Sequence, residues 1–276
     1  MSRMFDRLER DEVAVGTVML EHGPEWAELI GYAGLDFACI DMMVTSIDWR
    51  EAADVVRACT RFDVTPWIRL PAFPWGGADI DPRLPADVLR AISMGFEGVL
   101  ASVNTANAVA EMLGPLTEGH HRPYLSPKLV VEGVTPPRGP DDPEPWIFPL
   151  IESLEAIENL EEICKVEGLK AVMLGMGDIT RLLKQPHDRT PEIRKLVTDT
   201  VKLATEHDVA VISVSMAAFR HEGRDTPESV AEGIEWLHEA GVKVVWTPHM
   251  TAVAQRFYER VLATVAQHDP KTRPIV

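Results

Sequence analysis

The amino-acid sequence predicts a single (β/α)8 TIM barrel of the α/β class, and three observations lead to this fold. Eight short apolar stretches of strand type follow one another along the chain. Between them lie segments with apolar residues at every third or fourth position, which is the period of an amphipathic helix. The length of 276 residues suits one such barrel, and no linker divides it. We therefore expect one domain over 1–276, with an N-terminal extension over 1–11 and a C-terminal tail over 268–276.

The predicted strands are rich in aliphatic and β-branched residues and are bounded by turn residues. They are expected at 13–20, 37–41, 65–70, 97–103, 148–153, 173–180, 209–213 and 242–246. The main helices are expected at 26–33, 49–61, 87–94, 106–113, 154–168, 191–207, 227–240 and 251–267. Gly34 marks the end of the first helix, where a left-handed residue is favoured. The proline-rich stretches 71–85 and 119–145 lack periodicity and are expected to be loops.

The net charge and the cysteines indicate which classes of partner and which cellular compartment suit the protein. A formal net charge of −16 argues against nucleic acid or an anionic membrane as a partner, although a small anionic substrate can still meet a locally positive site. No stretch approaches the roughly 18 apolar residues of a membrane span, and the N-terminus lacks the apolar core of a signal peptide. Cys39, Cys59 and Cys164 are scattered and have no metal-site spacing, as is typical of buried thiols in a reducing compartment. We expect a cytoplasmic protein.

Two carboxylates stand at the ends of neighbouring predicted strands. Glu152 lies at the end of 148–153 and Asp178 near the end of 173–180, and the helix 154–168 connects the two strands. A right-handed crossover brings the carboxyl ends of such parallel strands to one edge of the sheet, where barrel enzymes place their chemistry. Paired oxygen ligands without Cys or His nearby suit Mg²⁺ or Mn²⁺. The alternative is that both are solvated acids at strand ends.

Four short motifs lie over the predicted barrel in a fixed order. They are Gly34-Leu-Asp-Phe with Ile-Asp41, Trp67-Ile-Arg69-Leu-Pro71, Ile151-Glu152 with Ala156-Ile-Glu-Asn159, and Gly175-Met-Gly-Asp178-Ile. Together they resemble the metal-dependent class II pyruvate aldolases of the HpcH/HpaI family, over a range from about Gly16 to the last helix. The family members form hexamers, so the resemblance implies a homo-oligomer.

The resemblance implies roles for specific residues. Glu152 and Asp178 would bind a divalent cation, Mg²⁺ or Mn²⁺ with Co²⁺ possible, that also holds a 2-oxo acid such as pyruvate. Arg69 would contact the keto or enolate oxygen. Gly175 and Gly177 would let backbone N–H groups approach the substrate carboxylate. Asp41 would order metal-bound water or neighbouring side chains; its alternative is a buried strand-end Asp bonded to backbone.

The chain departs from the family pattern at the acid/base pair. The family has Asp-x-Glu-His after the second strand, whereas here Met43 and Val44 replace the glutamate and the histidine. The partner aspartate before the fourth strand is Ser93. Val18 and Leu150 replace a tryptophan and a glutamine. We therefore expect a more apolar pocket and a weak aldolase unless another base has taken over, since general base catalysis contributes roughly 10²–10⁴-fold.

Two histidines are the candidates for that base, since His22 follows the first strand and His249 follows the last. Glu21 is a third possibility, and each histidine has the alternative of a rim residue bonded to backbone. Trp75 and Trp246 can line the pocket mouth, although a large aromatic residue on a barrel strand is more often part of the core.

The predicted function is a metal-dependent carbon–carbon lyase that acts on a small-molecule 2-oxo acid through a metal-bound enolate, with altered acid/base chemistry and specificity. One alternative is a decarboxylase, hydrolase or condensing enzyme that uses the same enolate. Another is a non-catalytic homologue that binds the cation and a 2-oxo acid.

Overall fold

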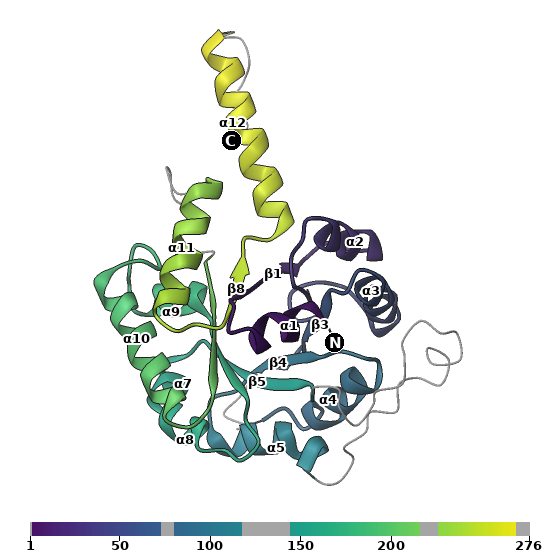
Figure 1. Ribbon diagram of the computed structural model, residues 1–276, viewed down its shortest axis with the longest axis vertical. Helices are drawn as coiled ribbons and strands as arrows, with labels where there is room; N and C mark the ends of the chain where they lie inside the picture. The colour runs from purple at the N-terminus through teal and green to yellow at the C-terminus, as the bar shows by residue number, and fades with distance from the viewer. Residues whose placement is uncertain (1, 73–79, 118–143, 216–225, 269–276) are drawn as a thin grey trace.

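The computed structural model describes residues 2–72, 80–117, 144–215 and 226–268, and eight parallel strands form a closed barrel in it (Figure 1). Each strand pairs with the next in sequence, and β1 pairs with β8 to close the sheet. The strands are β1 Ala14–Met19, β2 Phe37–Asp41, β3 Thr65–Arg69, β4 Gly98–Ser102, β5 Trp146–Ile151, β6 Ala171–Leu174, β7 Ala210–Val214 and β8 Val244–Thr247. The predicted (β/α)8 barrel is therefore confirmed.

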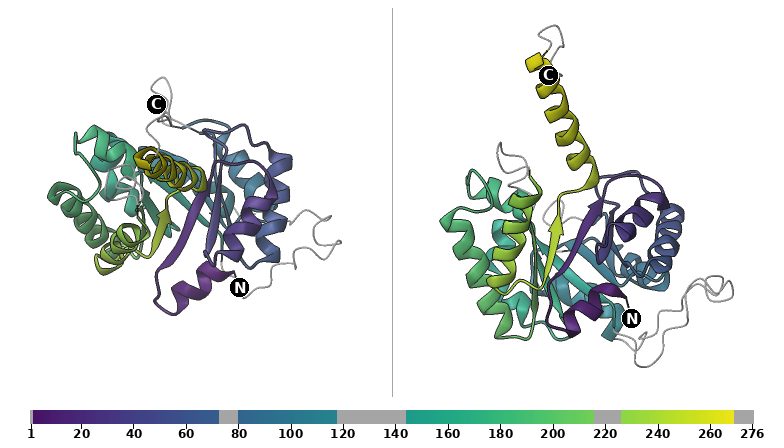
Figure 2. Two further views of the ribbon diagram at one scale, coloured as in Figure 1. Left: turned by 90° about the horizontal axis from the view of Figure 1, so that it is seen from above. Right: turned by 45° about the horizontal axis from the view of Figure 1, so that its top comes forward.

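Helices surround the sheet on its outer face (Figures 1 and 2). They are α1 Arg3–Glu9, α2 Pro24–Tyr32, α3 Trp49–Arg61, α4 Leu84–Ser93, α5 Ala106–Thr117, α7 Leu154–Glu158, α8 Leu160–Cys164, α9 Met176–Leu182, α10 Pro191–Thr205, α11 Pro227–Glu239 and α12 Met250–His268. Side-chain caps begin several of them, as at Asp48 before α3 and Thr190 before α10. None of the described helices combines the length and apolarity that a bilayer span requires.

The predicted N-terminal extension contains α1, which covers the amino-terminal end of the barrel. Met4 and Phe5 are buried there. The Arg3 guanidinium donates to the carbonyl oxygens of Leu35 and Phe62, in the segments that lead into β2 and β3, at 2.8 and 2.9 Å. This end of the barrel is closed, so the opposite end is the one open to ligands.

One long helix was expected between β5 and β6, and the structure has two short ones instead. The break falls at Asn159, between α7 and α8. The Asn159 side chain donates to the Asn104 carbonyl oxygen at 3.0 Å, and this contact with the loop after β4 interrupts the helix. The crossover still returns the chain to a parallel neighbouring strand.

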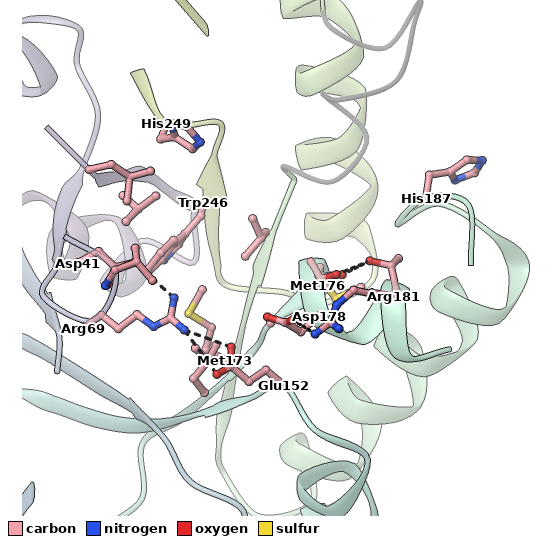
Figure 3. Close-up of a pocket in the computed structure, with 18 of the residues that line it drawn as sticks. Asp41, Arg69, Glu152, Met173, Met176, Asp178, Arg181, His187, Trp246 and His249 are labelled. Carbon is pink, nitrogen blue, oxygen red and sulfur yellow. Dashed lines mark hydrogen bonds and ion pairs between the residues drawn. The ribbon is translucent and has the colours of Figure 1, made fainter. Parts of the chain in front are cut away.

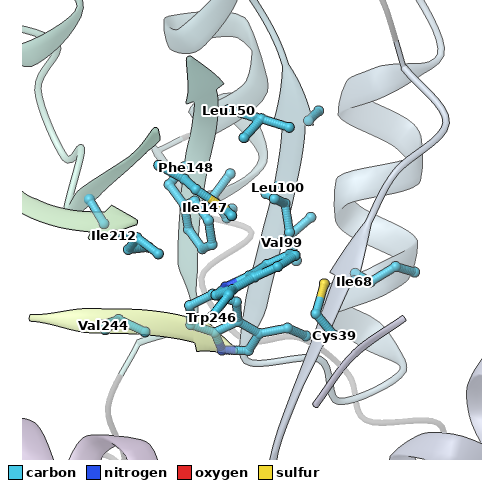
Figure 4. Packing of buried hydrophobic residues seen from close by; sticks show 14 of the residues in the cluster. Cys39, Ile68, Val99, Leu100, Ile147, Phe148, Leu150, Ile212, Val244 and Trp246 are labelled. Atoms are coloured by element: carbon cyan, nitrogen blue, oxygen red, sulfur yellow. The ribbon is translucent and has the colours of Figure 1, made fainter. Parts of the chain in front are cut away.

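Aromatic side chains fill the barrel interior (Figure 4). Phe37 stacks on Trp67 with ring centroids 4.3 Å apart, and Trp67 meets Phe148 edge-on at 5.0 Å. Glycines on neighbouring strands make room for them, because a Cβ on Gly16 or Gly98 would lie within 2.4 Å of the Phe37 or Trp67 ring, respectively. This packed layer forms a floor beneath the cavity described below.

Helix α12 extends away from the barrel, as Figures 1 and 2 show from three directions. Among its described side chains, Val253, Phe257, Tyr258 and Val261 are large, apolar or aromatic, and exposed.

Candidate active site

A cavity of about 660 Å³ lies at the carboxyl ends of the barrel strands (Figure 3). Its walls bring together most of the residues that the sequence singled out, namely Asp41, Val44, Arg69, Leu150, Glu152, Gly175, Gly177, Asp178, Trp246 and His249. Trp75 lies outside the described residues. His22 does not line the cavity.

Arg69 lies at the centre of the charged part of the cavity. It ends β3 directly beside Asp41, the last residue of β2. Its guanidinium is 3.4 Å from the Asp41 carboxylate and 3.3 Å from the nearer Glu152 oxygen. These contacts are longer than charge-assisted hydrogen bonds of roughly 2.7–2.9 Å. The guanidinium therefore partly compensates the negative charges of Asp41 and Glu152, and both carboxylates can accept a further hydrogen bond or ligand.

Glu152 follows β5 and has only 10% of its side chain exposed. The hydroxyl of Ser102, on neighbouring β4, donates to its Oε1. Burial raises the pKa of Glu152, and the charges of Asp178 and Asp41 add to this, whereas Arg69 and the Ser102 hydroxyl lower it. Gly175 permits the close approach of the next strand, because a Cβ there would lie 2.7 Å from the Glu152 Cβ. An additional positive charge would stabilise the ionised carboxylate.

Asp178 was predicted near the end of a strand, and the structure corrects this placement. Strand β6 ends at Leu174, and Asp178 lies in the first turn of α9, after the N-cap residue Gly175. A carboxylate in a first helical turn interacts favourably with the helix dipole. It still faces the cavity beside Glu152 (Figure 3). Arg181, one turn later, pairs with it at 2.6 Å.

Asp41 is buried and organises the loop that follows β2. Its Oδ1 accepts the backbone N–H groups of Met43 and Val44 at 3.0 and 3.3 Å, and its Oδ2 faces Arg69. Asp41 thus accepts backbone hydrogen bonds, as expected for a structural Asp at a strand end, and it also contacts the Arg69 guanidinium. It fixes the position of Val44, which replaces the family histidine.

The two candidate histidines lie in different surroundings. His22 contacts Glu51 at 2.9 Å through Nδ1 and Ser46 at 3.1 Å through Nε2. His249 lines the cavity, and its Nδ1 accepts the N–H of Ala252 at 3.1 Å. The Nδ1 atom of His249 is therefore engaged by the backbone at the start of α12. Glu21 is engaged in accepting N–H groups of Leu20 and Thr251.

Ser102, Met173 and Arg181 belong to the site and were not singled out from the sequence. Arg181 follows Asp178 by three residues, a spacing that brings side chains together only on a helix. This signal was hidden because the segment was interpreted as a strand. Ser102 and Met173 carry no local signal, since strand pairing alone brings them beside Glu152.

The donor set fits a divalent cation of the magnesium type. Glu152 and Asp178 line the same cavity and would be its two protein ligands. Among the described residues no group of three or more His, Cys, Asp or Glu side chains is found that could hold a metal ion. Cations that keep water or substrate oxygens, such as Mg²⁺, are bound in this way by one or two carboxylates. The Asp178–Arg181 pair shows that this carboxylate already attracts a cationic group. The residues present therefore fit the predicted cofactor.

Comparison with known proteins finds an aldolase by sequence and several barrels of the same fold by structure. The 2-dehydro-3,6-dideoxy-6-sulfogluconate aldolase of Pseudomonas putida is 26% identical over 204 residues, covering 70% of this chain and 74% of that protein. An HpcH/HpaI aldolase structure from Desulfitobacterium hafniense DCB-2 aligns with a TM-score of 0.77 at 20% identity, covering 99% of this chain and 100% of that one. The citrate synthase SbnG aligns with a TM-score of 0.72 at 20% identity, covering 98% and 99%. No model of a known protein family matches the sequence.

The solved structures share the fold of this chain over nearly its whole length. The resemblance to HpcH/HpaI aldolases that the four motifs indicated is borne out by a sequence match to an aldolase and by a structural match to an HpcH/HpaI aldolase. Aldolases found both by sequence and by structure support the prediction of an enzyme of the lyase class.

Proposed function

We propose that this protein is a metal-dependent carbon–carbon lyase of the HpcH/HpaI aldolase type that acts on a 2-oxo acid. The observation that carries the proposal is the placement of the Arg69 guanidinium between the carboxylates of Asp41 and Glu152, with Asp178 across the same cavity. A cationic donor next to a pair of hard oxygen ligands suits a reaction in which negative charge develops on a keto oxygen.

Glu152 and Asp178 would hold the cation, Mg²⁺ or Mn²⁺ with Co²⁺ possible. When bound, the cation would supply Lewis acidity toward the 2-oxo acid. The N–H groups of Gly175 and Asp178 bond to the carbonyl oxygens of Ile151 and Gly175. The substrate carboxylate would accordingly meet the N–H groups of Met176 and Gly177 in the first turn of α9.

The reaction that this site supports is the cleavage of a 4-hydroxy-2-oxo acid. The C4 hydroxyl proton passes to an acceptor, the C3–C4 bond breaks, and C4 becomes an aldehyde carbonyl carbon. The bond electrons form the C2–C3 double bond of the pyruvate enolate, and a proton then adds to C3 to give pyruvate. Arg69 stabilises the charge on the enolate oxygen through its fixed positive charge and planar N–H donors.

The proton acceptor is the weak part of the site. Met43 and Val44 cannot accept a proton, and the Nδ1 atom of His249 is engaged by the N–H group of Ala252. We propose that solvent water takes the hydroxyl proton, which makes aldol cleavage slow. The same observation favours a second candidate, the decarboxylation of a 2-oxo diacid, because loss of CO₂ gives the same enolate without removal of a hydroxyl proton.

A turnover assay with 4-hydroxy-2-oxo acids and oxaloacetate, in Mg²⁺, Mn²⁺ or Co²⁺, tests this proposal. Pyruvate release should depend on the cation and fall at least about 100-fold in Glu152→Gln. Glu158→Gln, an exposed position on α7, is the matched control and should keep full activity. Absence of turnover with every substrate, together with a cation-dependent rise in melting temperature on adding pyruvate, would instead support a binding protein.

We also propose a cytoplasmic homo-oligomer, a hexamer by the family resemblance. The exposed Phe257 and Tyr258 on α12 support an association surface. The three cysteines are free and buried, and burial raises the pKa of Cys164 to about 11, as suits unreactive thiols in a reducing compartment.

A further inference from the structure

The cavity has two chemically different sides. Its charged side consists of Asp41, Arg69, Glu152 and Asp178. A second side, the apolar wall, is formed by the ends of strands β1 and β5 to β8 and by the loop after β2, and the remaining lining includes the polar residues Thr180, Gln185, His187 and His249. The apolar residues of this wall are Val18, Leu150, Met173, Val214, Trp246 and Val44. The head group of a 2-oxo acid suits the charged side, and a group attached to it can then lie along the neighbouring apolar wall.

The apolar wall begins immediately beside the charged centre. Leu150, on β5, precedes Glu152 by two residues and is only 4% exposed. Met173 pairs with Leu150 across β5 and β6 and lines the same cavity as Arg69 and Glu152 (Figure 3). A hydroxyl or carboxylate placed against these side chains would lose its water without gaining a partner, which disfavours polar substituents.

Val44 provides a second apolar surface at the mouth of the cavity. It is 64% exposed, although its backbone is fixed by the hydrogen bond to Asp41. A ligand that covers Val44 removes apolar surface from water. The loss of conformational entropy on binding is small, because the hydrogen bond to Asp41 already fixes the loop backbone. Arg181, one of the polar lining residues, has 73% of its side chain exposed to solvent.

The size of the cavity leaves space for a sizeable substituent. At about 660 Å³ it falls in the range of pockets that hold drug-sized ligands, far beyond the needs of a three-carbon oxo acid. We propose, resting on the function proposed above, that the substrate is a 4-hydroxy-2-oxo acid with an apolar substituent on C4. Equivalently, the aldehyde partner of pyruvate is aliphatic or aromatic and not hydroxylated or anionic.

The test is aldol addition of pyruvate to a series of aldehydes, with the full-length protein and Mn²⁺. Propanal, butanal and hexanal form the apolar series, and glycolaldehyde is the polar counterpart. Each additional buried methylene should raise kcat/KM by about fourfold, so hexanal should exceed glycolaldehyde by more than about tenfold. Equal rates, or a preference for glycolaldehyde, would overturn the inference.

Substitutions in the apolar wall test whether these residues cause the preference for apolar aldehydes. Leu150→Gln and Val44→Ser should each lower the hexanal-to-glycolaldehyde ratio severalfold. Val44 is exposed, so its variant remains informative if Leu150→Gln does not fold. Leu89→Gln on the outer surface of α4 is the matched control and should leave the ratio unchanged. Ratios unaffected by both wall variants would overturn the inference.

The two proposals fail in different ways. Deuterium exchange at the pyruvate methyl group requires the enolate chemistry but no aldehyde. Exchange without any preference for apolar aldehydes would contradict the substrate class alone. Loss of both exchange and aldol addition in a folded, metal-loaded protein would contradict the proposed function, and the substrate class with it.

Discussion

Glu152 illustrates how one residue combines a functional role with a cost to folding. It is largely buried, and its pKa is raised first by that burial and then by Asp178 and Asp41. A carboxyl group with a raised folded-state pKa holds its proton more tightly in the folded protein. The protonated carboxyl group of Glu152 stabilises the folded state below the ordinary pKa of about 4.3. This contribution to the free energy of unfolding is lost as the pH rises through the raised folded-state pKa. Without a cation, ionised Glu152 therefore destabilises the fold.

Glu152→Gln should thus stabilise the metal-free protein relative to wild type, and the gain should grow from about pH 4 to about pH 8. Urea unfolding of both proteins with a chelator at the two pH values measures this difference. Glu158→Gln is the control and should give the same difference at both values. A Glu152→Gln effect that is independent of pH would contradict the burial argument.

At the level of elements, the β6–α9 junction sets the geometry of the site. Strand β6 ends at Leu174, and Gly175 turns the chain so that Asp178 faces the cavity from a helix. The space that Gly175 leaves is occupied by the Glu152 side chain on the neighbouring strand. The junction therefore couples the two proposed metal ligands. Glu152, after β5, can lie this close to the end of β6 only because residue 175 has no side chain.

Gly175→Ala should displace Glu152, because the new Cβ would lie 2.7 Å from the Glu152 Cβ. We expect a loss of roughly 1–3 kcal/mol in the free energy of unfolding, as for overpacked sites, together with a large loss of turnover. Gly177→Ala has no atom within 4 Å of its added Cβ and is the stability control, expected to be neutral or slightly stabilising. Chemical denaturation compares them, and equal stabilities would contradict this account of Gly175.

At the scale of the whole molecule, the barrel and much of its site follow from local patterns. Asp41, Arg69 and Glu152 end apolar stretches, and strand ends in a parallel barrel converge on one face. The helical position of Asp178 could not be predicted, because a short apolar run with two glycines fits a strand or a helix turn equally well. The contacts of His22 with Ser46 and Glu51 join the loop after β1 to the loop after β2 and to the first turn of α3, and no local pattern encodes such contacts.

The pyruvate methyl-proton exchange reaction, followed by NMR in D₂O, tests the central claim most directly. Wild-type protein with Mg²⁺, Mn²⁺ or Co²⁺ should exchange the methyl protons, and Glu152→Gln should reduce the rate at least about 100-fold while remaining folded. That result would establish that Glu152 supports enolate formation in a cation-dependent manner. Exchange that persists in Glu152→Gln, or that needs no cation, would contradict the account, as would its absence in folded wild-type protein with the cation bound.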